Sequence, residues 1–360
     1  MGRYRGGVTS ADDAPLLMAV DGNSLLHRAH HAHEHSDQRD AAGDPTWALR
    51  GFVSSIGGAA ARLTPDGVVV GFDCSGDSLR KRDYPAYKAG RREKSDDLVH
   101  QLAAAPDLLR ECGFTVVQHE GWEADDVMAS AAALARREGW RCAVVTSDRD
   151  AFALIDGWTS VLRVIVGGIS ASPLLTAERL PAACGVAAGQ YRDYAALRGD
   201  TSDNLPGALG IGAKTAARLL ATFGRVGDAY AAVQDGRRHE VEDVIGAAAT
   251  RRLLDPQARA NVARNLELMR MRDDLPVPPL AQMHVPLDLV RIQAALGLRD
   301  IRLGPSLWAL VGGAPPGGDG WGWRAEQHDL PPAVCAVAPA PEVVPDVEPE
   351  VERAAQLSLF

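Results

Sequence analysis

The chain has 360 residues, of which 46% are hydrophobic and 24% charged, a globular composition that excludes a collagen-like, coiled-coil or wholly disordered protein. It has no apolar run of the roughly 20 residues that a membrane helix needs, and its start does not resemble a secretion signal. The net charge of −9 is uneven, because residues 312–360 hold eight acids and two arginines. We therefore expect a cytoplasmic protein whose folded part is close to neutral.

Short apolar strands alternate with helical patterns in the first half of the chain. In chain order, the sequence predicts a strand at 16–20, a helix at 46–63, a strand at 67–72, a helix at 96–112, a strand at 115–118, a helix at 124–138 and a strand at 141–146. This alternation is typical of a parallel sheet with right-handed crossovers. We predict a flexible N-terminus at 1–14 and an α/β domain over 15–175.

The second half of the chain is mainly helical. A helical lobe is predicted over 176–311, with glycine and proline punctuation between 199 and 214. Residues 312–355 are rich in proline and glutamate, which predicts a disordered tail.

Acidic residues follow three of the predicted strands: Asp21, Asp73 and Asp148. One such residue alone would be a helix cap or turn former. Ligands of open α/β sheets bind beyond the carboxyl ends of the strands, so we expect the three to converge. Two further acidic groups raise the candidates to nine, namely Asp21, Asp73, Glu123, Asp125, Asp126, Asp148, Asp150, Asp200 and Asp203.

These nine acids have no histidine or cysteine among them, and an all-oxygen set favours hard cations. One Mg²⁺ ion, which keeps several waters, would not need so many carboxylates. The sequence therefore predicts two Mg²⁺ ions, which Mn²⁺ could replace, as in sites for in-line displacement at phosphorus.

Basic residues are concentrated directly after the strand that ends at Asp73. Three of the four lysines, Lys81, Lys88 and Lys94, lie there with Tyr84 and Tyr87. Rings between positive charges suit a single-stranded nucleic acid, and a solvated loop is the alternative.

The fourth lysine, Lys214, lies in the glycine-rich segment 207–215, which opens a predicted helix. Here backbone N–H groups could approach a phosphate. The spacing of Gly210 and Gly212 excludes a Walker A loop.

In order and spacing, these motifs resemble those of bacterial 5′-3′ exonucleases and flap endonucleases, including the N-terminal nuclease domain of bacterial DNA polymerase I. The matching segments are 20–24, 72–73, 87–91, 121–126, 146–150, 197–207 and 210–215. The resemblance implies a PIN-like core, with a mostly parallel sheet flanked by helices, a helical arch at 80–101 and a helix-turn-helix (H3TH-type) DNA-binding lobe. Since no polymerase sequence follows, we expect a stand-alone nuclease.

The resemblance also implies roles for single residues. Asp148, Asp150, Asp200 and Asp203 would serve the second metal ion and the other five acids the first. Lys88 and Arg91 would contact the scissile phosphate, and Arg80 and Tyr84 would steer the same strand. DNA contacts are predicted for Arg28, Lys81, Lys94, Gly210, Gly212, Lys214 and Thr215, with a possible K⁺ ion at the last four. The histidine-rich run 27–35 departs from the family and is predicted to be a solvated helix and loop.

The predicted function is hydrolysis of DNA at 5′ ends, flaps or nicks by a monomeric, nucleoid-associated nuclease that leaves a 5′-phosphate. The alternatives are a non-catalytic flap-binding protein and a related metal-dependent ribonuclease. A phosphatase with an aspartate nucleophile would need D-x-D where the chain has Asp21-Gly-Asn23.

The last five residues resemble the peptide by which bacterial proteins dock on the replication sliding clamp. In this interpretation Leu357, Leu359 and Phe360 would fill an apolar pocket, and Gln356 would fix the register. The alternative is a chance apolar end.

Overall fold

The computed structural model describes residues 14–33, 36–91, 93–303 and 305–314. Nearly all of the predicted N-terminal segment and tail, and the whole of the predicted clamp peptide (Gln356, Leu357, Leu359 and Phe360), lie outside the described residues. Within the described part of the chain, no helix is both long enough and apolar enough to cross a membrane.

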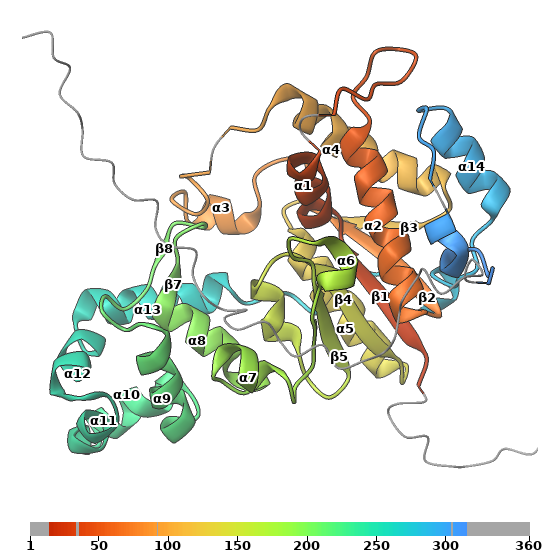
Figure 1. Ribbon diagram of the computed structural model, residues 1–360. Coiled ribbons are helices and arrows are strands. Elements are labelled where there is room, and N and C mark those ends of the chain that lie inside the picture. The colour runs from red at the N-terminus through yellow and green to blue at the C-terminus, as the bar shows by residue number, and fades with distance from the viewer. Residues whose placement is uncertain (1–13, 34–35, 92, 304, 315–360) are drawn as a thin grey trace, which may run out of the picture.

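A six-stranded sheet forms the centre of the molecule (Figure 1). Its strands are β1 (Leu16–Asp21), β2 (Gly67–Phe72), β3 (Thr115–Gln118), β4 (Arg141–Thr146), β5 (Thr159–Arg163) and β6 (Leu174–Leu175). In the order β3-β2-β1-β4-β5-β6, all neighbours are parallel except β5 and β6. The four predicted strands are confirmed, while β5 and β6 were not predicted.

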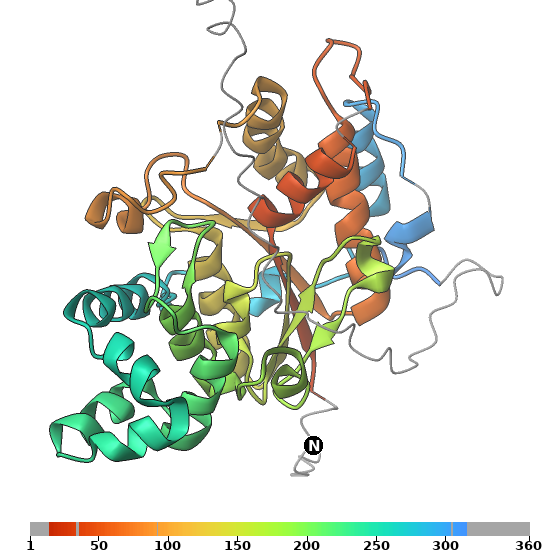
Figure 2. The same cartoon turned by 60° about the vertical axis from the view of Figure 1, so that its left-hand side comes forward.

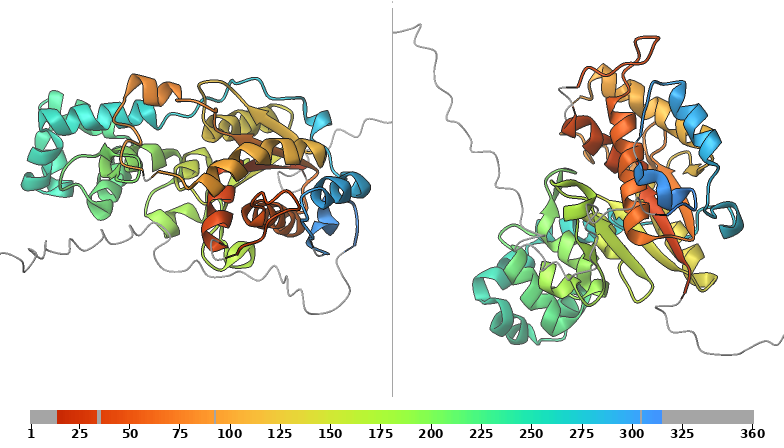
Figure 3. Two further views of the ribbon diagram at one scale, coloured as in Figure 1. Left: turned by 90° about the horizontal axis from the view of Figure 1, so that it is seen from above. Right: turned by 45° about the vertical axis from the view of Figure 1, so that its right-hand side comes forward.

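The two faces of the sheet bury separate cores. Along β1, Met18 and Val20 pack in one core and Leu17 and Ala19 in the other, because successive side chains of a strand point to opposite faces. The first core is covered by α1 (Gly22–Ala32), α2 (Trp47–Leu63) and α4 (Asp96–Glu111), and the second by α5 (Ala124–Arg137). Figure 3 shows these helix layers from above.

The second core continues into the helical lobe, which projects from the sheet (Figure 2). The lobe contains α7 (Leu180–Cys184), α8 (Tyr191–Arg198), α9 (Ala213–Phe223), α10 (Val226–Gln234), α11 (Arg238–Ile245), α12 (Ala247–Leu253) and α13 (Pro256–Leu268).

A short hairpin of β7 (Gly199–Asp200) and β8 (Leu205–Pro206) follows α8. A Cβ on Gly199 would lie 2.3 Å from the Gly207 nitrogen, so this crossing requires glycine. The hairpin presents its acidic turn, residues 200–204, toward the α/β domain.

The final described segment differs from the predicted division of the chain. We expected residues 176–311 to form one lobe, but α14 (Leu289–Gly297) and the 3₁₀ helix η5 (Pro305–Leu310) return to the α/β domain. Ile292, Leu296 and Leu307 are buried in the core that α2 covers. Apolar burial thus packs this last described segment against the helices that begin the α/β domain.

The predicted arch over 80–101 also needs correction. Only α3 (Leu79–Asp83) is helical before α4 begins at Asp96, among the residues described there. Gln101 is fully buried and its Oε1 accepts a hydrogen bond of 2.8 Å from the Ala48 nitrogen, so the start of α4 belongs to the helix layer. We therefore use "arch segment" for residues 79–95.

Candidate active site

The carboxyl edge of the sheet positions the first carboxylates, as predicted. Asp21 ends β1 and caps α1, with its Oδ1 accepting from the Ser24 nitrogen at 2.9 Å. Its Oδ2 accepts from the Thr146 hydroxyl at the end of β4, at 2.8 Å. Since β1 and β4 are neighbours from which the chain winds in opposite directions, this is where open α/β sheets bind ligands.

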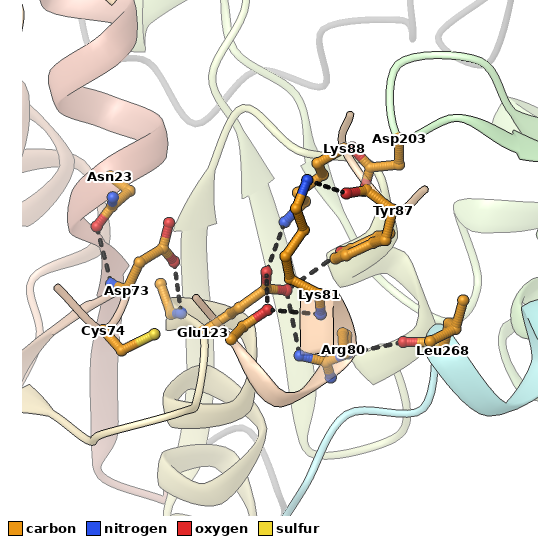
Figure 4. Close-up of polar contacts among 12 residues, drawn as sticks. Asn23, Asp73, Cys74, Arg80, Lys81, Tyr87, Lys88, Glu123, Asp203 and Leu268 are labelled. Carbon is orange, nitrogen blue, oxygen red and sulfur yellow. Dashed lines mark hydrogen bonds and ion pairs between the residues drawn. The ribbon is translucent and has the colours of Figure 1, made fainter. Parts of the chain in front are cut away.

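Asp73 is held next to this point by two neighbouring elements. Its nitrogen donates to Asn23 Oδ1 at 2.9 Å, and its Oδ1 accepts from the Ala124 nitrogen at 2.8 Å. Both contacts fix the loop that follows β2 against the starts of α1 and α5 (Figure 4).

A cleft of about 750 Å³ lies beyond these strand ends. Four predicted acids border it: Asp21, Asp73, Asp125 and Asp148. Asp125 also borders a much smaller adjoining space with three further acids: Glu123, Asp150 and Asp203. Asp200 lies next to Asp203, and the Asp203 nitrogen donates to Asp200 Oδ1 at 3.3 Å.

The three acids at the strand ends thus line one cleft, as expected, whereas the remaining acids are divided between this cleft, the smaller space and positions that border neither. Among the described residues, no three acidic, histidine or cysteine side chains converge closely enough to hold an ion in their present positions. Asp126 departs furthest, because it borders neither space and is fully buried.

Burial and mutual repulsion raise the pKa of several of these acids. Burial raises the pKa of Asp21 to about 7, and the charges of Asp73 and Asp148 act in the same direction. The pKa of Asp125 is raised by burial and then by Asp148 and Asp21, and that of Asp150 by burial and then by Asp148. A cation between oxygen ligands would offset this repulsion, so the donor set fits hard divalent ions.

Glu123 lies at the centre of a contrasting, charge-balanced cluster (Figure 4). Its Oε1 lies 2.9 Å from Lys88 Nζ, and its Oε2 lies 3.1 Å from the Tyr87 hydroxyl and 3.2 Å from Arg80 Nη1. Burial opposes ionisation of Glu123, but Lys88 and Arg80 outweigh it and lower its pKa.

The arch segment is also held to the acidic turn 200–204. The Lys88 nitrogen donates to the Asp203 carbonyl at 3.0 Å, and Asn204 Nδ2 donates to the Ala86 carbonyl at 2.9 Å. Arg91 Nη2 lies 2.6 Å from Asp203 Oδ1. Lys88 and Arg91, the two predicted phosphate contacts, thus pair with acids of the site.

Arg80 and the two tyrosines do not face the path that we expected for DNA. The Arg80 side chain is only 10% exposed, and all three of its nitrogens are engaged within the protein. Tyr87 is buried with its hydroxyl on Glu123, and the Tyr84 ring lies 4.6 Å from the Arg264 guanidinium. Stacking on bases, which we predicted for these rings, does not agree with these positions.

The predicted DNA contacts fall into two separate regions. Arg28 and Lys94 line the cleft, while Lys81 is tied to the Tyr87 carbonyl at 3.0 Å. At the start of α9, on the helical lobe, lie Gly210, Gly212, Lys214 and Thr215. Gly210, Gly212 and Lys214 are exposed, and Thr215 is half-buried.

Sequence reasoning missed several residues of the cleft. His27 and His31 of α1 line it, together with His33 at the C-cap of that helix. His31 and His33 are exposed, as predicted for a solvated segment, whereas His30 is buried; residues 34 and 35 of that run lie outside the described chain. Asn23, which also lines the cleft, was missed, as was Thr146, which is buried with its hydroxyl on Asp21. Two sequence features could have indicated them: Asn23 lies two residues after Asp21, and Thr146 is the last residue of β4.

Two family profiles match the chain. The N-terminal resolvase-like domain of the 5′-3′ exonucleases matches residues 16–180, and their C-terminal SAM fold matches residues 186–287. The chain belongs to the 5′-3′ exonuclease family. The two matches follow the observed division, since the second ends before α14.

Curated relatives of this exonuclease-family chain are DNA polymerases I. That of Mycobacterium tuberculosis is 36% identical over 263 residues, which are 73% of this chain and 28% of the relative. The thermostable enzyme of Thermus thermophilus is 34% identical over 261 residues, 72% of this chain and 29% of the relative. The chain therefore spans less than a third of the length of these relatives.

Solved structures confirm the predicted fold. T5 5′-exonuclease with bound zinc ions superposes with a TM-score of 0.56 at 23% identity, over 71% of this chain and 89% of that one. The catalytic core of Rad2 in complex with DNA gives 0.51 at 18% identity, over 79% and 88%.

The raised pKa of Asp21 predicts how stability depends on pH. A folded-state pKa above the unfolded value contributes stability that is present at low pH and lost as pH rises through 7. In EDTA, we expect the free energy of unfolding to fall between about pH 4 and about pH 7, by up to about 1.4 kcal/mol per pH unit for each proton released on unfolding. Urea titrations would measure the slope.

Asp21→Asn should flatten this slope, since the variant has no carboxyl at that position. Asp77→Asn, at an exposed aspartate near the arch segment, is the matched control and should keep the wild-type slope. An unchanged slope in Asp21→Asn would show that this carboxyl does not titrate as its burial requires.

Proposed function

We propose that this protein is a 5′-3′ exonuclease and structure-specific 5′ flap endonuclease that hydrolyses DNA with divalent metal ions. The observation that carries the proposal is the cleft itself, in which buried acids with raised pKa values face Lys88, Arg91 and Lys94. Carboxylates whose charge a cation would stabilise thus lie opposite lysine and arginine side chains that can bind an anion. A metal-bound phosphodiester satisfies both.

Asp21, Asp73, Asp125 and Asp148 would hold metal ions in the cleft, and Glu123, Asp150, Asp200 and Asp203 would complete the set. We propose two Mg²⁺ ions, with Mn²⁺ as a substitute. Bound there, the ions would activate water and offset negative charge on the phosphate. The raised pKa of Asp125 makes ionisation of this acid depend on a nearby cation.

Lys88 and Arg91 would bind the phosphate next to the bond that breaks. In the structure each of them lies beside one acid and offsets its charge, Glu123 and Asp203 respectively. Metal ions would take over that role, so the two side chains could turn to the substrate. Charge-assisted contacts of this kind stabilise the additional negative charge of the transition state.

The start of α9 would hold the duplex away from the cleft. Exposed Lys214 and the exposed backbone of Gly210 and Gly212 suit phosphate contacts, with a K⁺ ion as a possible additional link. Such contacts read backbone and shape rather than sequence. DNA with 5′ ends, flaps or nicks is the proposed substrate, bound by a monomer in the nucleoid.

A cleavage panel tests this function. With Mg²⁺, we expect a 5′-labelled flap duplex to be cut near its junction, leaving a 5′-phosphate, and blunt or nicked duplexes to be shortened from the 5′ end. Asp125→Asn should lower turnover by about 1,000-fold, while the exposed Asp77→Asn keeps it. An inactive wild-type chain, or one that cuts only RNA, would contradict the proposal.

Replacing Lys88 and replacing Lys214 should impair different steps, namely catalysis and duplex binding. Lys88→Ala should lower kcat about 100-fold with little change in duplex affinity, because its ammonium acts at the reacting phosphate. Lys214→Ala should weaken binding uniformly and reduce the slope of log affinity against log salt by about 1. Equal losses of kcat and affinity in both variants would contradict the assigned division of labour.

We also propose that the terminal peptide, with Gln356, Leu357, Leu359 and Phe360, docks on a bacterial sliding clamp. Its sequence and the Pro/Glu-rich segment before it support this proposal. Deletion of 356–360 should abolish clamp binding in a pull-down with purified clamp while basal cleavage is unchanged. Clamp affinity that survives the deletion would contradict it.

A further inference from the structure

Asp126 does not behave like the other acids of the family motif. Its carboxylate is fully buried and takes both terminal nitrogens of Arg80, with Nη1–Oδ2 and Nη2–Oδ1 distances of 2.6 Å. The Glu123 nitrogen donates to Oδ2 at 3.1 Å, and the Arg272 nitrogen donates to Oδ1 at 2.9 Å. Each oxygen thus accepts two strong hydrogen bonds, which leaves little capacity for a metal ion.

Arg80 also contacts Glu123 on one side and the segment at the end of α13 on the other. Its Nη1 also reaches Glu123 Oε2 at 3.2 Å (Figure 4). The guanidinium therefore joins Glu123, which borders the site, to Asp126, which does not. Its Nε donates to the Leu268 carbonyl at 2.7 Å and its Nη2 to the Arg270 carbonyl at 3.0 Å. Leu268 is the last residue of α13 in the helical lobe.

The segment after α13 is held along α5 by a second residue one turn further on. The Ser130 hydroxyl donates to the Arg272 carbonyl at 3.1 Å and accepts from the Leu275 nitrogen at 3.0 Å. Asp126 and Ser130 therefore hold the exit of the helical lobe against the helix that begins beside Glu123.

We propose that Arg80 and Asp126 are positioning residues, which fix Glu123 at the site and connect it to the helical lobe, and that Asp126 is not a metal ligand. This inference rests on the proposed nuclease function. A buried bidentate pair holds its geometry tightly, because moving either partner leaves an uncompensated charge in the interior. Displacement of the 268–272 segment would thus move Arg80 and, through it, the Glu123 carboxylate.

The direct test compares metal binding, without DNA, in neighbouring variants. We expect calorimetric Mn²⁺ titration to show that Asp126→Asn binds at least about tenfold more tightly than Asp125→Asn, because only Asp125 borders the cleft. Equal losses of Mn²⁺ affinity in both variants would overturn the inference and make Asp126 a ligand. This comparison does not depend on cleavage, so it stays valid if the proposed function fails.

A double variant separates positioning from mere stability. Arg80→Met and Asp126→Leu should each lower the Tm, since each leaves its partner buried and unpaired, whereas the double variant should recover most of that loss. Its kcat on a 5′ flap should nevertheless stay about 10–100-fold below wild type at unchanged KM, because Glu123 has lost its support.

If the double variant recovers kcat together with Tm, the pair is only structural and the inference fails. It also fails if the double variant binds Mn²⁺ no better than Asp125→Asn, which would show that a ligand had been removed. A wild-type chain without cleavage activity would instead count against the proposed function.

Discussion

Repulsion between carboxylates is the constraint on which the rest of the site depends. A parallel sheet brings its strand ends to one edge, and the sequence places acids there in numbers that apolar surroundings cannot tolerate without compensation. Asp21 and Asp125 respond by raised pKa values, whereas Glu123 stays ionised beside Lys88 and Arg80. The difference between the two responses follows from the positive partners, which Glu123 has within hydrogen-bond distance.

The same constraint explains how the arch segment and the helical lobe are attached. Lys88 reaches Glu123 at the N-cap of α5, and Arg91 reaches Asp203 in the turn 200–204. Gly199 allows that turn to cross close to the chain at Gly207, which brings Asp203 to the site. The arch segment and the helical lobe, which we propose to bind single-stranded and duplex DNA, are thus connected through Glu123 and Asp203, two of the proposed metal ligands.

Local sequence patterns were sufficient for four of the six strands of the sheet and for the acids that follow three of them. The strands β1, β2 and β4 are apolar runs followed by Asp21, Asp73 and the Ser147-Asp148 turn. The apolar runs therefore predicted the strands, and the rule that ligands bind beyond the carboxyl ends of strands predicted the site. The strand β5 was missed because polar Thr159, Ser160 and Arg163 dilute its apolar pattern.

Directions of side chains could not be predicted in the same way. Asp125 and Asp126 are adjacent and chemically identical, yet one borders the cleft and the other pairs with Arg80. That difference depends on the 268–272 segment, which lies far away in the chain. The return of α14 to the first core likewise depends on tertiary packing, which an amphipathic pattern does not specify.

A crystal structure with Mn²⁺, with anomalous data to place the ions, tests the central claim most directly. We expect manganese in the cleft between Asp21, Asp125 and Asp148, with Lys88 withdrawn from Glu123 and Asp126 still on Arg80. Manganese bound by Asp126, or none at the strand ends, would contradict it.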